Sequence, residues 1–140
     1  MARPLPEIEA RAVIAGGKVG HLGCIVKDEP YVVPIDYVIE GETIYSHSLP
    51  GRKIQALRAH PRACLQVEQI DDDFHWRSAI AFGCFAEVTD NLERAKALRK
   101  LLDRFPMLTP VESRLAQDAT PPEVIVFRIH IDRITGLAEE

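Results

Sequence analysis

The segment Tyr45–Lys53, Y-S-H-S-L-P-G-R-K, contains several side chains that can bind an anion or transfer a proton. Its pattern predicts a strand that turns into a helix, and the first turn of a helix presents free N–H groups and a partial positive charge. Ser48 adds a hydroxyl and is a plausible N-cap, while Arg52 and Lys53 add two cations to that turn. These features are typical of a phosphate-binding site. The alternative is a capped surface helix whose two basic side chains are solvated.

Other reactive side chains stand alone in the sequence. The imidazole of His47 titrates near neutral pH and could donate a proton, or His47 could be a packed strand residue with one hydrogen bond. Trp76, Arg77 and Ser78 follow an acidic run at the start of a long strand. Asp36 interrupts an otherwise apolar strand. None of these residues predicts a function without its neighbours.

The familiar short motifs do not occur. The glycines form no G-x-G-x-x-G pattern, and the sequence contains neither H-E-x-x-H nor G-x-S-x-G. The histidines are dispersed, and none has a cysteine or carboxylate at zinc-finger spacing. We therefore expect no metal site.

Apolar periodicity and turn residues predict the helices and strands that carry these side chains. Tyr31–Ile39 is the clearest strand, because it is rich in β-branched and aromatic residues. The expected order is helix Pro6–Ala15, strands Val19–Val26, Tyr31–Ile39 and Thr43–His47, helix Arg52–Ala59, strands Arg62–Ile70 and Trp76–Val88, a helix from an Asp90 cap to about Phe105, a linker Pro106–Pro122, and a strand Glu123–Ile134. Few crossover helices and many antiparallel meanders favour a mainly β fold, a small barrel or sandwich.

The predicted third helix has two distinct faces. Its apolar stripe should face the core and consists of Leu92, Ala95, Leu98, Leu101, Leu102 and Phe105. Its basic residues, which we expect to be solvated, are Arg94, Lys96, Arg99, Lys100 and Arg104.

The composition is that of an ordinary globular domain. The 17 basic and 21 acidic residues give a formal net charge of −4, which argues against a nucleic-acid binder. The longest apolar run, Ala79–Ala86, is far shorter than the ~20 residues of a membrane span, and the N-terminus lacks the apolar region of a secretory signal. An odd, scattered set of three cysteines fits a reducing cytoplasm. We therefore expect a single cytoplasmic domain over residues 1–140, with no membrane or nucleic-acid partner.

Five short pieces occur in an order and spacing that resemble one family. They are P-Y-V-V-P-I at 30–35, I-Y-S-H-S at 44–48, G-R-K at 51–53, H-P-R-A at 60–63 and W-R-S at 76–78. The chain is similar to the pyridoxamine 5′-phosphate oxidase-related superfamily, and most of all to its small flavin-nucleotide-binding branch, which includes nitroimidazole-resistance proteins. The resemblance implies an antiparallel split β-barrel that pairs into a homodimer, with FMN in a cleft between the subunits.

The resemblance also implies roles for residues at matching positions. The phosphate-binding positions are matched by Ser48, Arg52 and Lys53. The strand along the isoalloxazine ring is matched by Pro34, Ile35, Asp36 and Tyr37, and the strand beside it by Tyr45 and His47. A strand that contacts the ring or ribityl chain is matched by Trp76, Arg77 and Ser78. The expected function is that of a small FMN-dependent oxidoreductase acting on a nitro compound, a quinone or a similar small molecule. Arg77 would stabilise the reduced ring at its N1–C2 edge, and His47 would donate a proton.

The resemblance leaves alternatives open. The chain has fewer basic residues at the phosphate-binding positions than true pyridoxamine phosphate oxidases have. A deazaflavin or haem is therefore an alternative cofactor. The chain could also be a non-catalytic module that binds flavin or haem as a store, sensor or electron carrier. Arg128-Ile129-His130 looks like the substrate motif of the B6 oxidases, but it reads as strand alternation, so vitamin B6 oxidation is not expected.

Overall fold

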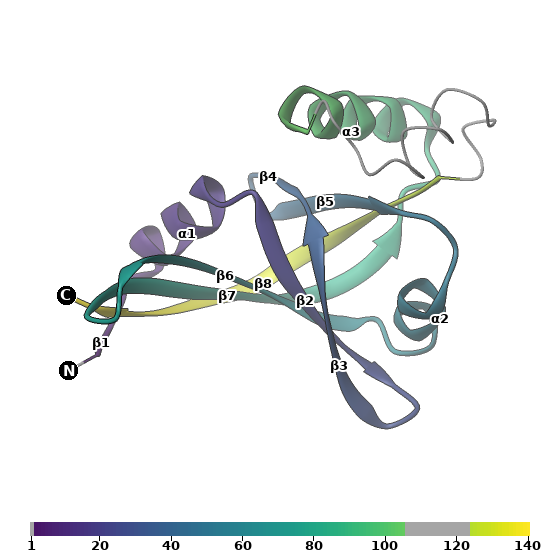
Figure 1. The fold of residues 1–140 in the computed structure, drawn as a ribbon. Coiled ribbons are helices and arrows are strands. Elements are labelled where there is room, and N and C mark those ends of the chain that lie inside the picture. The colour runs from purple at the N-terminus through teal and green to yellow at the C-terminus, as the bar shows by residue number, and fades with distance from the viewer. Residues whose placement is uncertain (1, 106–123) are drawn as a thin grey trace.

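The computed structural model describes residues 2–105 and 124–140, and the predicted linker 106–122 lies outside the described residues. The elements are β1 Arg3–Pro4, α1 Glu7–Gly16, β2 Val19–Val26, β3 Glu29–Asp36, β4 Val38–Glu40, β5 Thr43–Ser48, α2 Arg52–Ala59, β6 Arg62–Asp72, β7 His75–Glu87, α3 Asn91–Arg104 and β8 Ile125–Glu139 (Figure 1). The predicted bounds of β2 and α2 are confirmed to the residue.

The strands form one antiparallel sheet in the order β3-β2-β6-β7-β8-β5-β4, with β1 paired to β8. β3 and β4 are opposite edges of this sheet, yet only Tyr37 separates them in the chain. The two edge strands are thus consecutive in the chain, so the sheet must curve until its edges lie near each other. The result is a split β-barrel. The prediction of one continuous strand over Tyr31–Ile39 is wrong, because the chain changes edge at Tyr37. Apolarity on both faces of a segment does not reveal such a bend.

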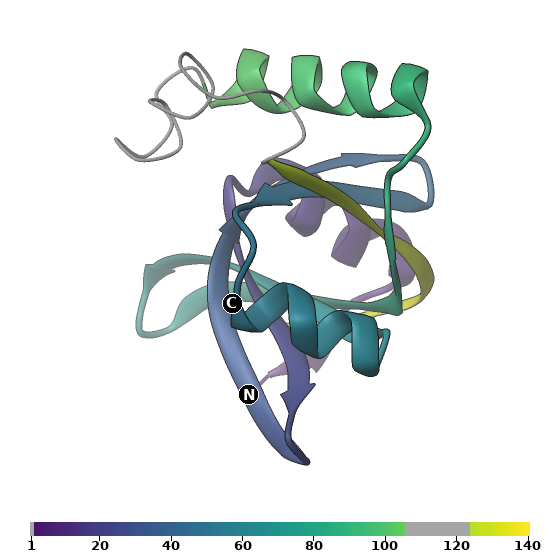
Figure 2. The same ribbon diagram turned by 90° about the vertical axis from the view of Figure 1, so that its right-hand side faces the viewer.

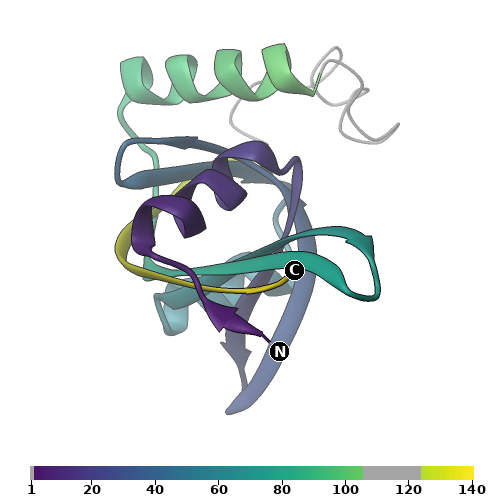
Figure 3. The same cartoon turned by 90° about the vertical axis from the view of Figure 1, so that its left-hand side faces the viewer.

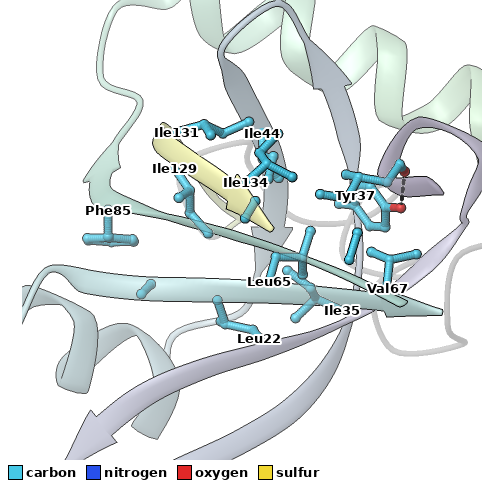
Figure 4. Packing of buried hydrophobic residues seen from close by; sticks show 14 of the residues in the cluster. Leu22, Ile35, Tyr37, Ile44, Leu65, Val67, Phe85, Ile129, Ile131 and Ile134 are labelled. Atoms are coloured by element: carbon cyan, nitrogen blue, oxygen red, sulfur yellow. Dashed lines mark hydrogen bonds between the residues drawn. The ribbon is translucent and has the colours of Figure 1, made fainter. Parts of the chain in front are cut away.

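Two helices close the barrel and complete its core. α1 contributes Ala10, Val13 and Ile14 and packs against β6, β7 and β8. α2 contributes Ile54 and Leu57 and packs against β2 and β7. Figures 2 and 3 show the two helices on opposite sides of the barrel. Figure 4 shows the apolar side chains of the sheet that meet between them, including Leu22, Ile44, Leu65 and Ile129.

β7 presents two chemically different faces. Small residues, Ala79 and Ala81, point into the barrel, and Phe85 joins them near the end of the strand. The opposite, outer face is half-exposed, and it carries Trp76, Ser78, Ile80, Phe82, Cys84 and Ala86. The outer face of the sheet therefore has an apolar surface that the described helices leave uncovered.

α3 packs differently from the prediction. Asp90 is its N-cap, as expected, and its carboxylate accepts a hydrogen bond of 2.9 Å from the backbone N–H of Glu93. Of the predicted apolar stripe only Leu101 is buried, together with Ala97 outside it, whereas Leu92 is 64% exposed. The prediction of a buried apolar stripe is wrong because α3 lies on the outside of β4 and β5. In this position only a narrow strip of the helix surface contacts the two strands.

The basic side of α3 makes much of this contact. Arg94 donates to the carbonyl of Val124 at 2.5 Å, Lys100 pairs with the carboxylate of Glu40, and Arg104 donates to the carbonyls of Ala15 and Gly17. The prediction that all five basic residues are solvated is therefore wrong for Arg94 and Arg104, which are half-buried, whereas Lys100 is exposed as expected. Lys96 and Arg99 are exposed as expected.

Candidate functional site

The N-terminus of α2 is the centre of the predicted phosphate site. Gly51 is the N-cap, and among the described residues no side chain caps it and no acidic residue lies in the first turn. The prediction that Ser48 is the N-cap is wrong, because three residues separate Ser48 from the helix and its hydroxyl donates to the carbonyl of Leu49 at 2.8 Å. Arg52 and Lys53 occupy the first turn as predicted. Free N–H groups and two cations thus gather at one point.

A groove of about 730 Å³ begins at this helix end. One wall is α2, with Gly51, Arg52, Gln55, Ala56, Ala59 and His60. The other is the β2–β3 hairpin, with Ile25, Val26, Lys27, Glu29, Pro30 and Tyr31. In Figure 2, α2 crosses in front of the barrel and the hairpin extends below it. We call this cavity the α2 groove.

The groove residues of the hairpin were missed by the sequence reasoning. Lys27 and Asp28 both have positive φ, 49° and 66°, so a two-residue turn places the start of β3 directly opposite α2. Lys-Asp is not one of the common sequences for such a turn. The helical spacing of Arg52, Gln55 and Ala59 did mark one continuous face of α2, and this signal could have been used.

The two strands predicted to flank a ring do lie together. The hydroxyl of Ser46 in β5 donates to the backbone carbonyl of Asp36, at the end of β3, at 2.5 Å. Ile35 and Tyr37 are buried in the core, whereas Pro34 is exposed and Asp36 half-buried. Only the backbone here and the side chains of Pro34 and Asp36 can therefore meet a ligand outside the core.

Tyr45 lies on the face of β5 that α3 covers. Its hydroxyl donates to Glu93 of α3 at 2.9 Å, and Arg128 of β8 donates to both oxygens of the same carboxylate at 2.6 and 2.8 Å. Burial, followed by the contact with Glu93, raises the pKa of Tyr45. Because side chains alternate along a strand, His47 shares this face, and it is only 7% exposed. Its burial favours a packed strand residue over a proton donor.

Trp76, Arg77 and Ser78 lie at the opposite end of the molecule from α2. α2 reaches β7 through the ion pair of Arg58 with Glu87, ten positions along the strand from Arg77, or about 33 Å at ~3.3 Å per residue. Within one chain, these residues therefore do not meet the α2 site.

Arg77 is also separated from its two neighbours by strand alternation. Its guanidinium binds the carboxylate of Glu140 at 2.9 Å, on the opposite face from Trp76 and Ser78. Hydrogen bonds from Arg3 above all, and then from Arg77, lower the pKa of Glu140. Arg77 is thus held in an ion-pair cluster that includes β1.

The described residues hold neither a metal-binding cluster nor a helix of membrane-spanning character. Within residues 2–105 and 124–140, no three His, Cys, Asp or Glu side chains gather in a way that could hold a metal ion. In the same ranges, no helix is long and apolar enough to cross a membrane.

Comparison with known proteins identifies relatives that align with nearly the whole chain. A sequence model of pyridoxamine 5′-phosphate oxidase matches residues 6–138. An uncharacterized protein of Rhizobium meliloti (strain 1021) is 30% identical over 146 aligned positions, 97% of this chain and 94% of the relative. The crystal structure of a FAD-binding protein from Mesorhizobium loti superimposes with a TM-score of 0.84 at 29% identity, covering 100% of this chain and 99% of that chain. A putative 5-nitroimidazole antibiotic resistance protein from Bacteroides thetaiotaomicron has a TM-score of 0.74 at 20% identity, covering 100% and 93%; at that identity the likeness shows the fold alone.

Proposed function

Because the chain belongs to the pyridoxamine 5′-phosphate oxidase family, we propose that it is a flavoprotein that binds FMN and acts as an oxidoreductase on a small molecule such as a nitro compound or a quinone. The uncapped N-terminus of α2 is the observation that carries the proposal. The FAD-binding relative from Mesorhizobium loti supports a flavin as the ligand.

The residues at the start of α2 fit a phosphate group. The positive end of a helix disfavours two further cations, so Arg52 and Lys53 at this position are best explained by an anion that the helix binds. The N–H groups of the first turn and the two side chains would all donate to phosphate oxygens. Added to Gly51, a Cβ would meet nothing within 4 Å, so there is open space directly in front of these donors.

The ring of the flavin would lie along the junction of β3 and β5. Pro34 and Asp36 are available there, and the hydrogen bond from Ser46 fixes the backbone of Asp36. A flavin supplies the hydride and single-electron chemistry, so the chain itself need only bind, orient and shield it. We do not assign the proton transfer to His47, because its burial leaves little surface for a substrate.

We propose that a second copy of the chain completes the site. The outer face of the sheet carries exposed apolar side chains on four strands. They are Val19 and Ile25 of β2, Val32 of β3, Ile70 of β6 and Leu137 of β8. Exposed apolar patches of this kind mark interfaces. Trp76 and Ser78 lie on the same face. A homodimer through this face would bring them to the partner's flavin, whereas Arg77 remains with Glu140 on the other face.

The phosphate contact can be tested with a ligand pair. Riboflavin shares the ring and ribityl chain of FMN but lacks the phosphate. Each charge-assisted hydrogen bond is worth about 1.5–3 kcal/mol, so Arg52→Ala with Lys53→Ala should weaken FMN about 10- to 150-fold or more and leave riboflavin unchanged. The matched control is Lys96→Ala with Arg99→Ala, which removes the same charge from exposed positions of α3. Equal loss of both ligands would place Arg52 and Lys53 away from the phosphate.

Catalysis can be separated from binding in the same samples. Anaerobic addition of NADH or NADPH to the flavin-loaded protein should bleach the flavin absorption, and a nitro compound or quinone should restore it. A flavin that is bound but never reduced would identify a store or sensor. A Soret band after reconstitution with haem, with no flavin uptake, would overturn the flavin proposal.

A further inference from the structure

The three cysteines lie on three strands of the sheet, and their surroundings differ. Cys24 of β2 is buried in the core, and burial raises the pKa of its thiol. Cys64 of β6 and Cys84 of β7 are half-buried. Both lie on the outer face of the sheet, because the buried residues of these strands occupy the alternate positions. A dissolved reagent can therefore reach Cys64 and Cys84 more easily than Cys24.

Cys84 lies between a cation and an imidazole. β6, β7 and β8 run side by side (Figure 1), and the residues opposite Cys84 are Arg62 of β6 and His130 of β8. Opposite residues share a face, with Cβ atoms about 4.5–5.5 Å apart. Nη1 of Arg62 donates a hydrogen bond to Sγ of Cys84 at 3.1 Å, and the same nitrogen donates to the carboxylate of Asp132. We call Cys84, Arg62, His130 and Asp132 the Cys84 cluster.

A β-bulge in β8 contributes to this cluster. The register shifts after Phe82, so Asp132 is an extra residue with no opposite partner on β7. The strands come close together just beside it, since a Cβ at Gly83 would lie 2.0 Å from the carbonyl oxygen of His130. The bulge thus adds a carboxylate to the outer side of β8, and this carboxylate orients the guanidinium of Arg62.

The Cys84 cluster is open to small solutes. The side chains of Arg62 and Asp132 are 59% and 44% exposed, and His130 is exposed as well. Trp76, which the proposed dimer would cover, is eight positions away from Cys84 along β7, about 26 Å at ~3.3 Å per residue. The charged cluster is therefore separate from that end of the sheet.

We propose that Cys84 is a site of reversible oxidation, at which hydrogen peroxide converts the thiol to a sulfenic acid. This reaction needs no flavin, so it goes beyond the proposed function and can fail or succeed independently of it.

Each group of the cluster has a part in the reaction. The thiol proton passes to the neutral imidazole of His130, and the Arg62 cation stabilises the thiolate that remains. The sulfur attacks one oxygen of the peroxide, so an S–O bond forms and the O–O bond breaks. Sulfur loses an electron pair and the peroxide gains it. The leaving hydroxide takes the proton from His130, so a thiol and hydrogen peroxide give a sulfenic acid and water.

The sulfenic acid should persist, because neither of the other cysteines can reach it. Cys64 is opposite Phe82, so it is a diagonal neighbour of Cys84. Diagonal neighbours are about 7–8 Å apart, whereas the Cα atoms of a disulfide are ~4.4–6.8 Å apart. Cys24 is buried on the other face of the sheet. A sulfenic acid without a partner thiol is reversed by a reducing thiol from solution.

The test measures the modification of all three thiols in the full-length protein. After a brief exposure to hydrogen peroxide, dimedone traps sulfenic acids, and peptide mass spectrometry gives the label on each cysteine. Because the thiolate is the nucleophile, Cys84 should carry about tenfold or more label than Cys64, the control on the same face. Cys24 should carry the least.

Two arginine variants separate the contact with sulfur from the charge of the face. Arg62→Ala should slow the labelling of Cys84 about threefold or more, since the smaller thiolate population is only partly offset by greater nucleophilicity. Arg133→Ala is the matched control. Its guanidinium carbon lies 3.9 Å from the centre of the Phe82 ring, so the change removes the same charge from the same face. It should leave the rate within about twofold.

A third variant tests the base. His130→Gln keeps a polar side chain that cannot take the thiol proton, and it should also slow the labelling of Cys84. Circular dichroism checks that each variant folds. If Arg62→Ala does not fold, Arg62→Lys takes its place, with a smaller slowing in the same direction because a cation remains.

The contrary results are equally defined. Equal labelling of Cys84 and Cys64 in the wild-type protein would overturn the proposal. Equal slowing in Arg62→Ala and Arg133→Ala would overturn it too, because the charge of the face and not the contact would then set the reactivity. An unchanged rate in His130→Gln would overturn the proton transfer. A disulfide between Cys64 and Cys84 in place of the label would overturn the persistent sulfenic acid.

Discussion

The guanidinium carbon of Arg104 lies 5.6 Å from the centre of the Tyr37 ring. Tyr37 is the single residue between β3 and β4, where the chain passes from one edge of the sheet to the other, and it is fully buried. Its hydroxyl donates to the carbonyl of Ile14 near the end of α1, and Arg104 donates to the carbonyls of Ala15 and Gly17 beside it. One cation at the end of α3 therefore binds the C-terminal end of α1, where the helix dipole is negative, and covers the corner of the barrel.

The Tyr37 phenol should make the protein sensitive to alkali. Burial raises its pKa from 10 to about 12, and Arg104 only partly opposes this. A raised pKa means that the neutral phenol stabilises the fold fully below pH 10 and that this contribution disappears as the pH rises through 12. The loss should reach about 2–3 kcal/mol, at ~1.36 kcal/mol per pKa unit.

Urea unfolding at a series of pH values between 8 and 12 measures this loss. Tyr37→Phe should be less stable at neutral pH, since the Ile14 carbonyl loses its donor, and should show a smaller decline above pH 10. A variant whose decline matches the wild type would mean that other groups cause the alkaline loss.

Arg104→Ala should loosen α3 selectively. The change removes a cation–π contact and the hydrogen bonds to α1, together worth about 1–3 kcal/mol. Amide hydrogen exchange should therefore accelerate in α3 more than in β6 and β7. Arg99→Ala, an exposed position on the same helix, is the control and should leave exchange unchanged. Uniform acceleration through the whole barrel would contradict a local role.

Gly17 should not tolerate a side chain. A Cβ at this position would lie 2.4 Å from Cγ1 of Val67 and 2.7 Å from the Tyr37 hydroxyl oxygen, both on buried residues. Gly17→Ala should therefore cost about 1–3 kcal/mol of unfolding free energy. Gly16→Ala is a close control, because a Cβ there meets nothing within 4 Å, and it should be neutral or slightly stabilising. Equal melting temperatures for the two variants would disprove the close packing at Gly17.

The proposed dimer face can be tested with two exposed apolar residues. Val32 is 66% exposed on the outer sheet face, and Phe74 is 72% exposed in the β6–β7 turn, away from the centre of that face. Val32→Asp would bury two carboxylates in a symmetric interface and should dissociate the dimer, whereas Phe74→Asp should not. Sedimentation velocity measures both. A wild-type protein that sediments as a 15.7 kDa particle would remove the dimer and the shared site.

The sequence alone determined much of the local structure. α2 begins at Arg52 and ends at Ala59 as predicted, because Pro61 and the preceding loop limit it on both sides. The Asp90 cap of α3 is also local, because its carboxylate accepts from the backbone N–H of Glu93, only three residues later. The split barrel and the position of Arg52 and Lys53 in a helix's first turn were likewise expected. The split barrel came from a resemblance spread over short pieces in order.

The remaining features depend on contacts between residues distant in the sequence. Nothing local shows that Tyr37 marks a change of sheet edge, since a buried strand and a buried corner have the same apolar composition. The α2 groove exists only because the β2–β3 hairpin, more than twenty residues earlier, lies against α2. Trp76 and Ser78 lie about 30 Å from α2 because strand length fixes their distance along β7. Spacing in the sequence specifies the side chains that one helix or strand presents, whereas the pairing of elements specifies which of those side chains meet.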